Sequence, residues 1–461
     1  MTFPHALFVM LLCAAVGSYT WGMRGTIIGG ERGALLPGAA LATVLICAGG
    51  VEPVSEAFPF AAAIGAAAMF FGGAQTYGET IGLTFDADKK TRMHGRLGLA
   101  IKGANWFGIF AGILGVGLGA MAGRYALWEL LLFTLLLPAV KWLGVFGLKL
   151  LRKKLPQLYF SKTRFEVWGG MTLLWLYILL FAALHKEWFP VLLGVFGFVS
   201  GALGFWVGNL FQTKFDGKGN GFIGGWKWME CAFGAIGGLG VALCWCLFYD
   251  IFVYKYAFQI VGHSGVWTLL REQTNAILLF AWLFLFVLFL LHYLFDPKKQ
   301  DTSKAAKLAY RAEDILVWPV FCYVPLFLAM SGNARAAQIE SFFMVLYVIG
   351  DKIIFGGAKH YENLFGEKVY HCALMLLPAA VLYVQLFTDY TFSALQTMLM
   401  YLFAYLLAEY YAVFNLNRMR PLCAEHGSAA KALLSMGSTL SWMVYAGVCC
   451  IAITGMSIFY F

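Results

Sequence analysis

The stretch Leu97–Ala122, LGLAIKGANWFGIFAGILGVGLGAMA, decides the fold class of this chain. It holds one charged residue, Lys102, in an apolar run that exceeds the roughly 20 residues needed to cross a bilayer. Similar runs alternate with short polar loops from residue 6 to the C-terminus. Only helices or closed barrels satisfy the backbone in lipid, and these runs are too long for barrel strands. The sequence therefore predicts an all-α polytopic integral membrane protein.

The composition indicates the same class. Of the 461 residues, 61% are hydrophobic and 12% are charged, whereas a soluble domain is about half apolar and about a quarter charged. At about 33 residues for each span and its loop, the length predicts about fourteen transmembrane helices. Their expected bounds are 6–21, 35–51, 58–83, 97–122, 125–148, 166–185, 188–213, 228–249, 276–295, 313–331, 336–355, 369–388, 393–415 and 432–460.

The lysines and arginines predict the orientation. Of these 33 residues, 26 lie in loops that follow odd-numbered runs and five lie in loops that follow even-numbered runs. Because basic loops stay in the cytoplasm, we expect a plasma-membrane or inner-membrane protein with both termini outside the cytoplasm. The formal charge of +9 then suits an anionic inner leaflet and gives no indication of a nucleic-acid partner.

Glycine is unevenly distributed along the chain and suggests its organisation. Most of the 52 glycines precede residue 245, and small residues let membrane helices approach closely. We therefore expect a Gly-rich N-terminal helical bundle over residues 1–250 that houses the functional site. An external amphipathic loop over 251–275 and a C-terminal helical bundle over 276–461 would complete the chain.

An internal repeat is also indicated. Lys102–Gly119 aligns without gaps with Gly224–Val241, and Trp106 then matches Trp228. Runs 3 and 4 would correspond to runs 7 and 8 in the same orientation, and parallel repeats are common in transporters. The alternative is that Gly-rich membrane helices resemble one another by composition alone.

The most unusual polar segment is Trp21–Gly38, WGMRGTIIGGERGALLPG, between the first two runs. Its glycines free the backbone to turn and can leave N–H groups for an anion. Arg24 and Arg32 offer forked donors suited to phosphate or carboxylate, and Glu31 could pair with them or titrate. The segment favours a re-entrant or broken-helix substrate loop. The alternative is a plain cytoplasmic turn whose arginines follow the positive-inside rule.

A second polar segment, GGAQTYGET at 72–80, lies at the inner half of the third run. Gln75 and Glu79 are four residues apart and would share a helix face. A carboxylate in an apolar helix is costly, so Glu79 is the first candidate for a proton-coupling or cation-coupling residue. The alternative is a structural ion pair with a neighbouring basic residue such as Lys102.

Further candidates for solute binding lie on runs 4, 7 and 8. They are Lys102, Asn105, Trp106, Asn209, Lys227, Trp228 and Glu230. A cation beside an indole suits a sugar, a carboxylate or a phosphorylated compound. The alternative is that the lysines extend to the interface and the tryptophans belong to an aromatic belt.

These features favour a secondary transporter of a small polar solute, with an anion preferred and proton coupling through Glu79 or Glu31. The alternative is a membrane-embedded transferase that acts on a lipid-linked or phosphorylated substrate through the acidic loop Asp86–Asp88 and a metal. A structural subunit of a larger complex is a third reading. The chain has no Walker loop, H-E-x-x-H or G-x-S-x-G motif and its ten cysteines are scattered, so we expect no cofactor, metal site or catalytic residue. The expected partners are the lipid bilayer and the solute.

Overall fold

The computed structural model describes residues 1–27, 30–50, 58–152, 154–161, 166–215, 224–253, 308, 318, 322–330 and 416–435. Within these ranges the chain is helical and contains no strand. The main helices are α1 (Phe3–Ile27), α2 (Gly30–Gly49), α4 (Phe58–Gly73), α6 (Lys89–Met121), α7 (Leu127–Leu151), α8 (Trp168–Leu184), α9 (Trp188–Phe215) and α10 (Gly225–Leu247). Shorter helices are α5 (Gly78–Leu83), α15 (Val324–Met330), α19 (Leu416–His426) and α20 (Ala429–Ser435). A 3₁₀ turn, Pro156–Leu158, and a π turn, Tyr249–Val253, complete the described elements.

Five helices, α1, α6, α7, α9 and α10, are long and apolar enough to cross a membrane, and α2, α4 and α8 contain shorter apolar stretches. The chain is thus an all-α integral membrane protein, as its sequence predicts. Each of the first eight predicted runs coincides with one main helix, although the third run is broken near its end. Most of the loop 251–275 and of the C-terminal bundle lies outside the described residues, so the total of about fourteen spans stays a prediction.

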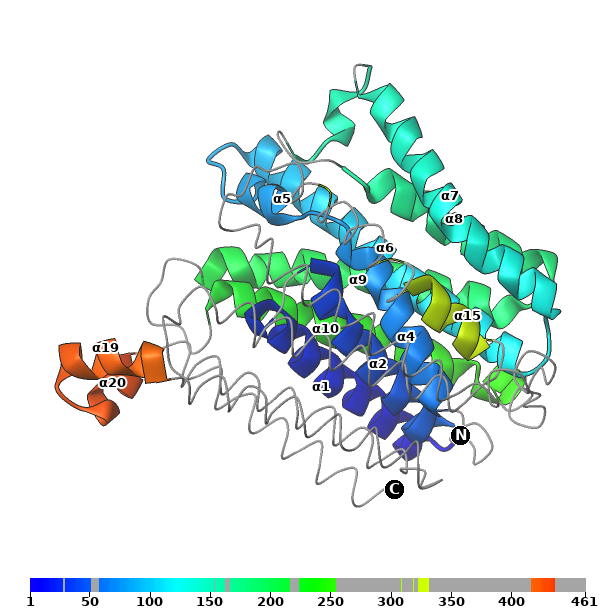
Figure 1. Cartoon of the computed structure of the whole chain (residues 1–461), viewed down its shortest axis with the longest axis horizontal. Coiled ribbons are helices and arrows are strands. Elements are labelled where there is room, and N and C mark those ends of the chain that lie inside the picture. The colour runs from blue at the N-terminus through cyan, green and yellow to red at the C-terminus, as the bar shows by residue number, and fades with distance from the viewer. Residues whose placement is uncertain are drawn as a thin grey trace.

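Six helices contact one another in a closed circuit in the order α1, α2, α4, α6, α9, α10 and back to α1. The hairpin α7–α8 packs outside this circuit, with α8 against α6 and α9, and α15 packs against α4 (Figure 1). Neighbouring helices in the circuit run in alternating directions, because most of their connections are short. The loops after the odd-numbered runs therefore all lie at one end, which we call the polar end.

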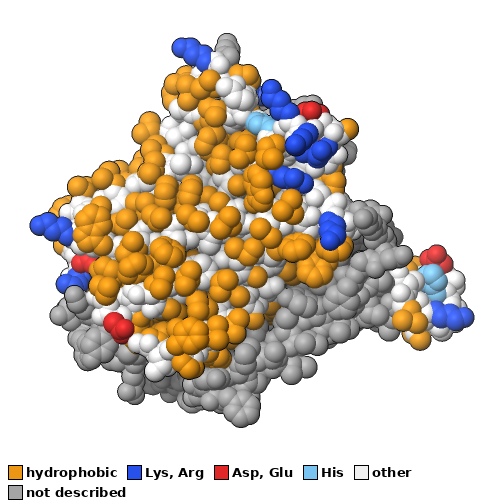
Figure 2. Space-filling view, turned by 180° about the vertical axis from the view of Figure 1, so that it is seen from behind, with side chains coloured by type: hydrophobic (Ala, Val, Ile, Leu, Met, Phe, Trp, Pro, Cys, Tyr) orange, Lys and Arg blue, Asp and Glu red, His pale blue; other side chains and the backbone are white. Residues whose placement is uncertain are grey.

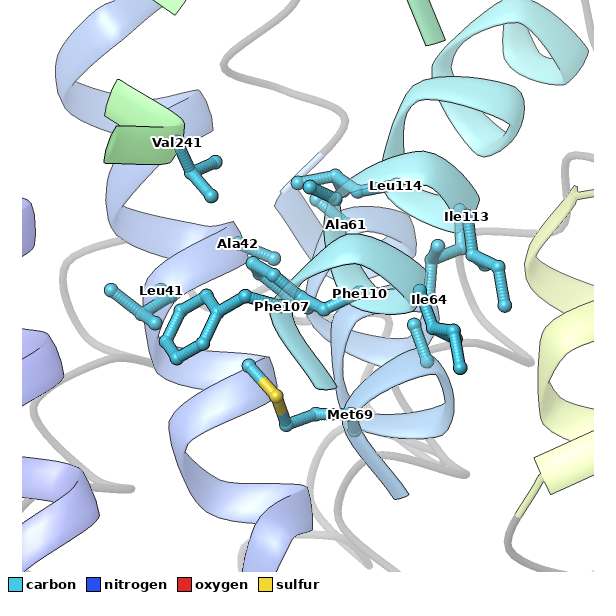
Figure 3. Packing of buried hydrophobic residues seen from close by; sticks show 14 of the residues in the cluster. Leu41, Ala42, Ala61, Ile64, Met69, Phe107, Phe110, Ile113, Leu114 and Val241 are labelled. Carbon is cyan, nitrogen blue, oxygen red and sulfur yellow. The ribbon is translucent and has the colours of Figure 1, made fainter. Parts of the chain in front are cut away.

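Large apolar side chains fill the inside of the circuit. Phe107 and Phe110 of α6 point toward Leu41 of α2, Met69 of α4 and Val241 of α10 (Figure 3). All five side chains are buried. Lipid tails are as apolar as these residues, so close packing rather than escape from water holds such helices together.

Glycines set the closest approaches between the helices of the circuit. Three pairs cross at facing glycines, namely Gly17 with Gly234 (α1–α10), Gly38 with Gly65 (α2–α4) and Gly103 with Gly201 (α6–α9). A Cβ added to Gly17 would lie 2.2 Å from the carbonyl oxygen of Gly234. These three crossings are therefore backbone-to-backbone contacts that only glycine permits.

The outer surface is apolar over most of the face in Figure 2, and Lys and Arg side chains gather near its edges. On α7, Trp128, Leu135, Trp142 and Leu143 are more than half exposed. An apolar face of this extent on a helix that is long enough to span a bilayer is the surface that lipid tails cover.

The glycine-rich segment Trp21–Gly38 differs from the predicted loop. α1 continues to Ile27, α2 begins at Gly30, and Pro37 lies inside α2 rather than at its start. In an apolar medium a helix satisfies its own backbone groups, and this outweighs the weak helix propensity of glycine. Most of this segment is therefore helical rather than a long loop, while the broken-helix form of the prediction and its role in substrate binding stay predictions.

Candidate functional site

The third predicted run unwinds at the polar end. α4 ends at Gly73 and α5 begins at Gly78, so residues 74–77 form a turn between two helices. A Cβ on Gly72 would lie 1.9 Å from Trp106 Cδ1, and the Trp106 indole donates a hydrogen bond to the carbonyl of Met69 at 2.8 Å. The indole of α6 therefore packs directly on the backbone at the end of α4.

This break separates two residues that the sequence places on one helix face. Gln75 lies in the turn and is buried, whereas Glu79 lies in the first turn of α5 and is half-buried. The prediction of a shared face is wrong because the helical spacing does not extend through residues 74–77. Gln75 faces α6, while Glu79 accepts a hydrogen bond from Ser161 Oγ at 2.6 Å.

Lys102 is fully buried at the unwound turn. Its ammonium donates to the carbonyl oxygen of Thr76, to Thr80 Oγ1 at 2.8 Å and to Glu166 Oε1 at 3.4 Å, and it forms an ion pair with Glu166 Oε2 at 3.0 Å. The three acceptors come from the turn, from α5 and from the segment before α8. An ammonium has three N–H donors, and these three oxygens match them.

Gln75 and Asn105 extend this network along α6. Gln75 Nε2 donates to the carbonyl of Lys102 at 2.9 Å, and Asn105 Nδ2 donates to Gln75 Oε1 at 3.3 Å. Asn105 also donates to the carbonyl of Trp168 at 3.1 Å and accepts from Thr172 Oγ1 at 3.0 Å. These two predicted solute ligands therefore connect α6 to the turn and to α8 in this structure.

Arg24 lies in an aromatic enclosure at the end of α1. Its guanidinium carbon is 4.8 Å from the ring centroid of Trp106 and 5.1 Å from that of Trp21. Arg24 Nη1 donates to Tyr77 Oη at 2.8 Å and lies 3.6 Å from Glu230 Oε1. The side chains of Arg24 and Glu230 are each 2% exposed. An arginine between aromatic faces gains cation–π attraction that grows as water is removed.

Several buried polar atoms in this enclosure have spare capacity. Trp21 Nε1 finds no acceptor among the described residues, and the Glu230 carboxylate receives a side-chain contact from Trp226 but no hydrogen bond of good geometry from them. Lys227, which is half-buried, donates to the carbonyl of Gly22. Arg24 and Lys227 supply two positive charges and Glu230 one negative charge. Among the described side chains of the enclosure the positive charges therefore outnumber the negative one, and several polar atoms could be satisfied by a water or a ligand.

The other predicted residues lie near the edge of this region. Asn209 Nδ2 donates to Thr84 Oγ1 at 2.9 Å, and Arg96 Nε donates to Asn209 Oδ1 at 3.4 Å. Trp228 is half-buried and stacks on Phe215 of α9 with ring centroids 5.5 Å apart.

Trp228 and its proposed repeat partner Trp106 have different surroundings, because Trp106 is buried inside the circuit. The internal repeat therefore stays a prediction. Glu31 and Arg32 lie in the first turn of α2, but their side chains fall outside the described residues.

Sequence reasoning missed three residues of the site, namely Glu166, Tyr77 and Trp21. Glu166 stands at the very edge of an apolar run, where a carboxylate is ordinary, and nothing in its spacing points to Lys102. Tyr77 and Trp21 were inside the quoted segments, but aromatic residues in membrane helices are common. The one available signal was their position beside Arg24 and Glu79 in polar, Gly-rich stretches.

The acidic loop before α6 has a local structural role. Asp88 caps α6 by accepting from the backbone N–H of Thr91 at 2.8 Å, and Asp86 Oδ1 accepts from the backbone N–H of Asp88 at 2.9 Å. The hydrogen bond from Thr91 holds the pKa of Asp88 below its usual range. No group of three or more His, Cys, Asp or Glu side chains in the described part of the chain could hold a metal ion.

Comparison with protein-family models, with curated proteins and with solved structures finds no match to this chain. Function must therefore be inferred from the enclosure itself.

Proposed function

We propose that this protein is a secondary transporter of a small anionic solute and that Arg24 binds the anion. The observation that supports this most is a buried guanidinium held among aromatic rings beside a carboxylate 3.6 Å away. Ionisable residues inside a membrane protein are costly and mark substrate or proton pathways. A purely structural ion pair at this depth needs close, fully hydrogen-bonded partners, whereas Arg24 and Glu230 stand 3.6 Å apart and Trp226 is the side chain that contacts the Glu230 carboxylate as a neutral donor.

We further propose that Glu230 couples transport to protons. An ionised Glu230 neutralises Arg24, whereas a protonated Glu230 leaves the guanidinium charge to an incoming anion. Solute and proton would then bind together and leave together, which is symport. Glu79 and Glu31, the coupling residues expected from the sequence, remain secondary candidates because Glu79 already accepts a hydrogen bond from Ser161 and lies nearer the edge.

The test is thermal unfolding of the purified protein in detergent with inorganic phosphate, acetate and succinate as probes. At least one anion should raise Tm, and the rise should be larger at mildly acidic than at mildly alkaline pH. Arg24→Gln should abolish the rise. Glu230→Gln imitates the protonated carboxyl and should make the rise independent of pH.

Arg124→Gln is the matched control. Arg124 lies at the opposite end of the bundle, where its Nε is 3.8 Å from Glu187 Oε1. This variant should respond to the anion as the wild type does. An equal Tm rise in Arg24→Gln and in the wild type would refute the assignment of the site, and no rise with any of the three probes would refute the assignment of these solute classes.

The alternative of a membrane-embedded transferase gains no specific support from the acidic loop. Asp86 and Asp88 are engaged in capping α6 and ordering the turn before it. The second acidic cluster that such an enzyme would need, residues 296–301, lies outside the described residues.

A further inference from the structure

A second buried charge, separate from the Arg24 enclosure, has the coordination expected of a bound cation. The Lys102 ammonium meets a backbone carbonyl, a hydroxyl and a carboxylate, from Thr76, Thr80 and Glu166. These are the hard oxygen ligands that alkali and alkaline-earth ions use. Unwound backbone carbonyls at a helix break are a recurring part of ion sites in membrane carriers.

The oxygen ligands are themselves held in place. Glu166 Oε1 accepts the backbone N–H of Phe160 at 3.1 Å, and Thr80 Oγ1 can donate to the carbonyl of Phe160 at 3.3 Å. The segment that carries Phe160 thus fixes two of the three ligands independently of Lys102. Ligands fixed by outer contacts keep their geometry when the central ion changes.

We propose that Thr76, Thr80 and Glu166 form a monovalent-cation site in which the Lys102 ammonium is a tethered substitute for a free ion. An ammonium and a potassium ion are similar in size, so the cage suits potassium best, and sodium would require the oxygens to move inward. In the wild type the positive charge of Lys102 stabilises the unwound turn beside Arg24, so that no alkali ion is needed there. This inference stands apart from the anion at Arg24, since it concerns other ligands and another ion.

The test replaces Lys102, which removes the tethered ammonium, and supplies a free cation in the buffer. Lys102→Ala is purified in detergent, and its Tm is measured in potassium chloride, sodium chloride and choline chloride at equal ionic strength. Potassium should raise Tm by several degrees in a saturable manner, sodium should do so less, and choline should not. The wild type should show the same Tm in all three salts, because its site is already filled.

Two variants serve as controls. Lys141→Ala removes the other buried lysine of the described helices, whose ammonium lies over the ring of Trp318 at 3.4 Å from the centroid, so it should show no preference for potassium. Lys102→Ala combined with Glu166→Gln removes the charge of the cage and should lose the response.

Equal Tm of Lys102→Ala in the three salts would overturn the proposal. A failure of this variant to fold in every salt would also overturn it, because the cage would then need the lysine chain rather than a cation. If potassium raises the Tm of Lys141→Ala by the same amount, the response of Lys102→Ala is a general salt effect, and the proposal is overturned as well. The measurement uses no transported solute, so its failure leaves the anion proposal untouched.

Discussion

Replacing Gly17 with alanine tests the packing that holds α1 against α10. The added Cβ would lie 2.2 Å from the carbonyl oxygen of Gly234, which is 1.2 Å closer than the 3.4 Å at which ordinary van der Waals contact begins. The added Cβ is fixed to the backbone of α1 and the oxygen belongs to the backbone of α10, so neither can rotate away and the two helices must separate. Overpacking of this kind costs about 1–3 kcal/mol. Alanine also favours the helix over glycine by about 1 kcal/mol, which offsets part of that cost.

The matched control is Gly147→Ala on α7. A Cβ at Gly147 would meet nothing within 4 Å, so this variant changes helix propensity without a clash. Thermal unfolding in detergent should give a lower Tm for Gly17→Ala than for the wild type, and a Tm at or above wild type for Gly147→Ala. If Gly17→Ala is as stable as Gly147→Ala, the close crossing of α1 and α10 is wrong.

Three further predictions concern the polar end. Glu79→Gln should leave concentrative uptake into proteoliposomes as in the wild type, because the proposed coupling residue is Glu230; loss of concentrative uptake with exchange intact would instead assign the coupling proton to Glu79. Trp106→Phe removes a buried hydrogen bond to Met69 and should lower the free energy of unfolding by about 1–3 kcal/mol, measured by denaturant titration, since the Met69 carbonyl then lacks its donor. Asp88→Ala should lower Tm at neutral pH, because the lowered pKa of Asp88 means that the ionised form stabilises the fold. That contribution is present above the ordinary pKa of an aspartate and is lost as the pH falls through the lowered value. The Tm difference between wild type and Asp88→Ala should therefore shrink in acid, and a constant difference from neutral to acidic pH would contradict the capping role.

The membrane class and the first eight helices could be predicted because apolar run length and loop charge are strong, local signals. The break after Gly73 was not predicted, although residues 72–80 were recognised as polar, because it coincides with a contact between Gly72 and Trp106, which lies on another helix. The helical state of the residues on either side of 28–29 was missed for the opposite reason, because local glycine content suggested a loop while an apolar medium favours helical backbone.

The candidate site was predicted in part. Arg24 and Glu230 were both singled out, but 206 positions separate them and no spacing rule pairs them; the contact arises because α1 crosses α10 at Gly17 and Gly234. Lys102 and Asn105 contact Glu166, Gln75 and Trp168, which sequence spacing did not predict, and their expected role in solute binding stays a prediction. A sequence shows which polar residues lie in the helices of a membrane bundle. Which of these residues contact one another depends on which helices become neighbours.

The three crossings at facing glycines pair six helices into what we call struts, α1 with α10, α2 with α4, and α6 with α9, and α9 also meets the backbone of α10 at Gly208 and Met229. Within each strut the backbones touch, so the strut should move as one rigid beam. Arg24 belongs to the first of these beams and Trp106 to the third, while Tyr77 lies in the turn that follows α4, and their contacts meet at a single junction. A motion that opens the protein alternately to its two sides would first have to break the contacts at that junction. The Arg24 guanidinium would then both bind the proposed anion and hold the three helix pairs together.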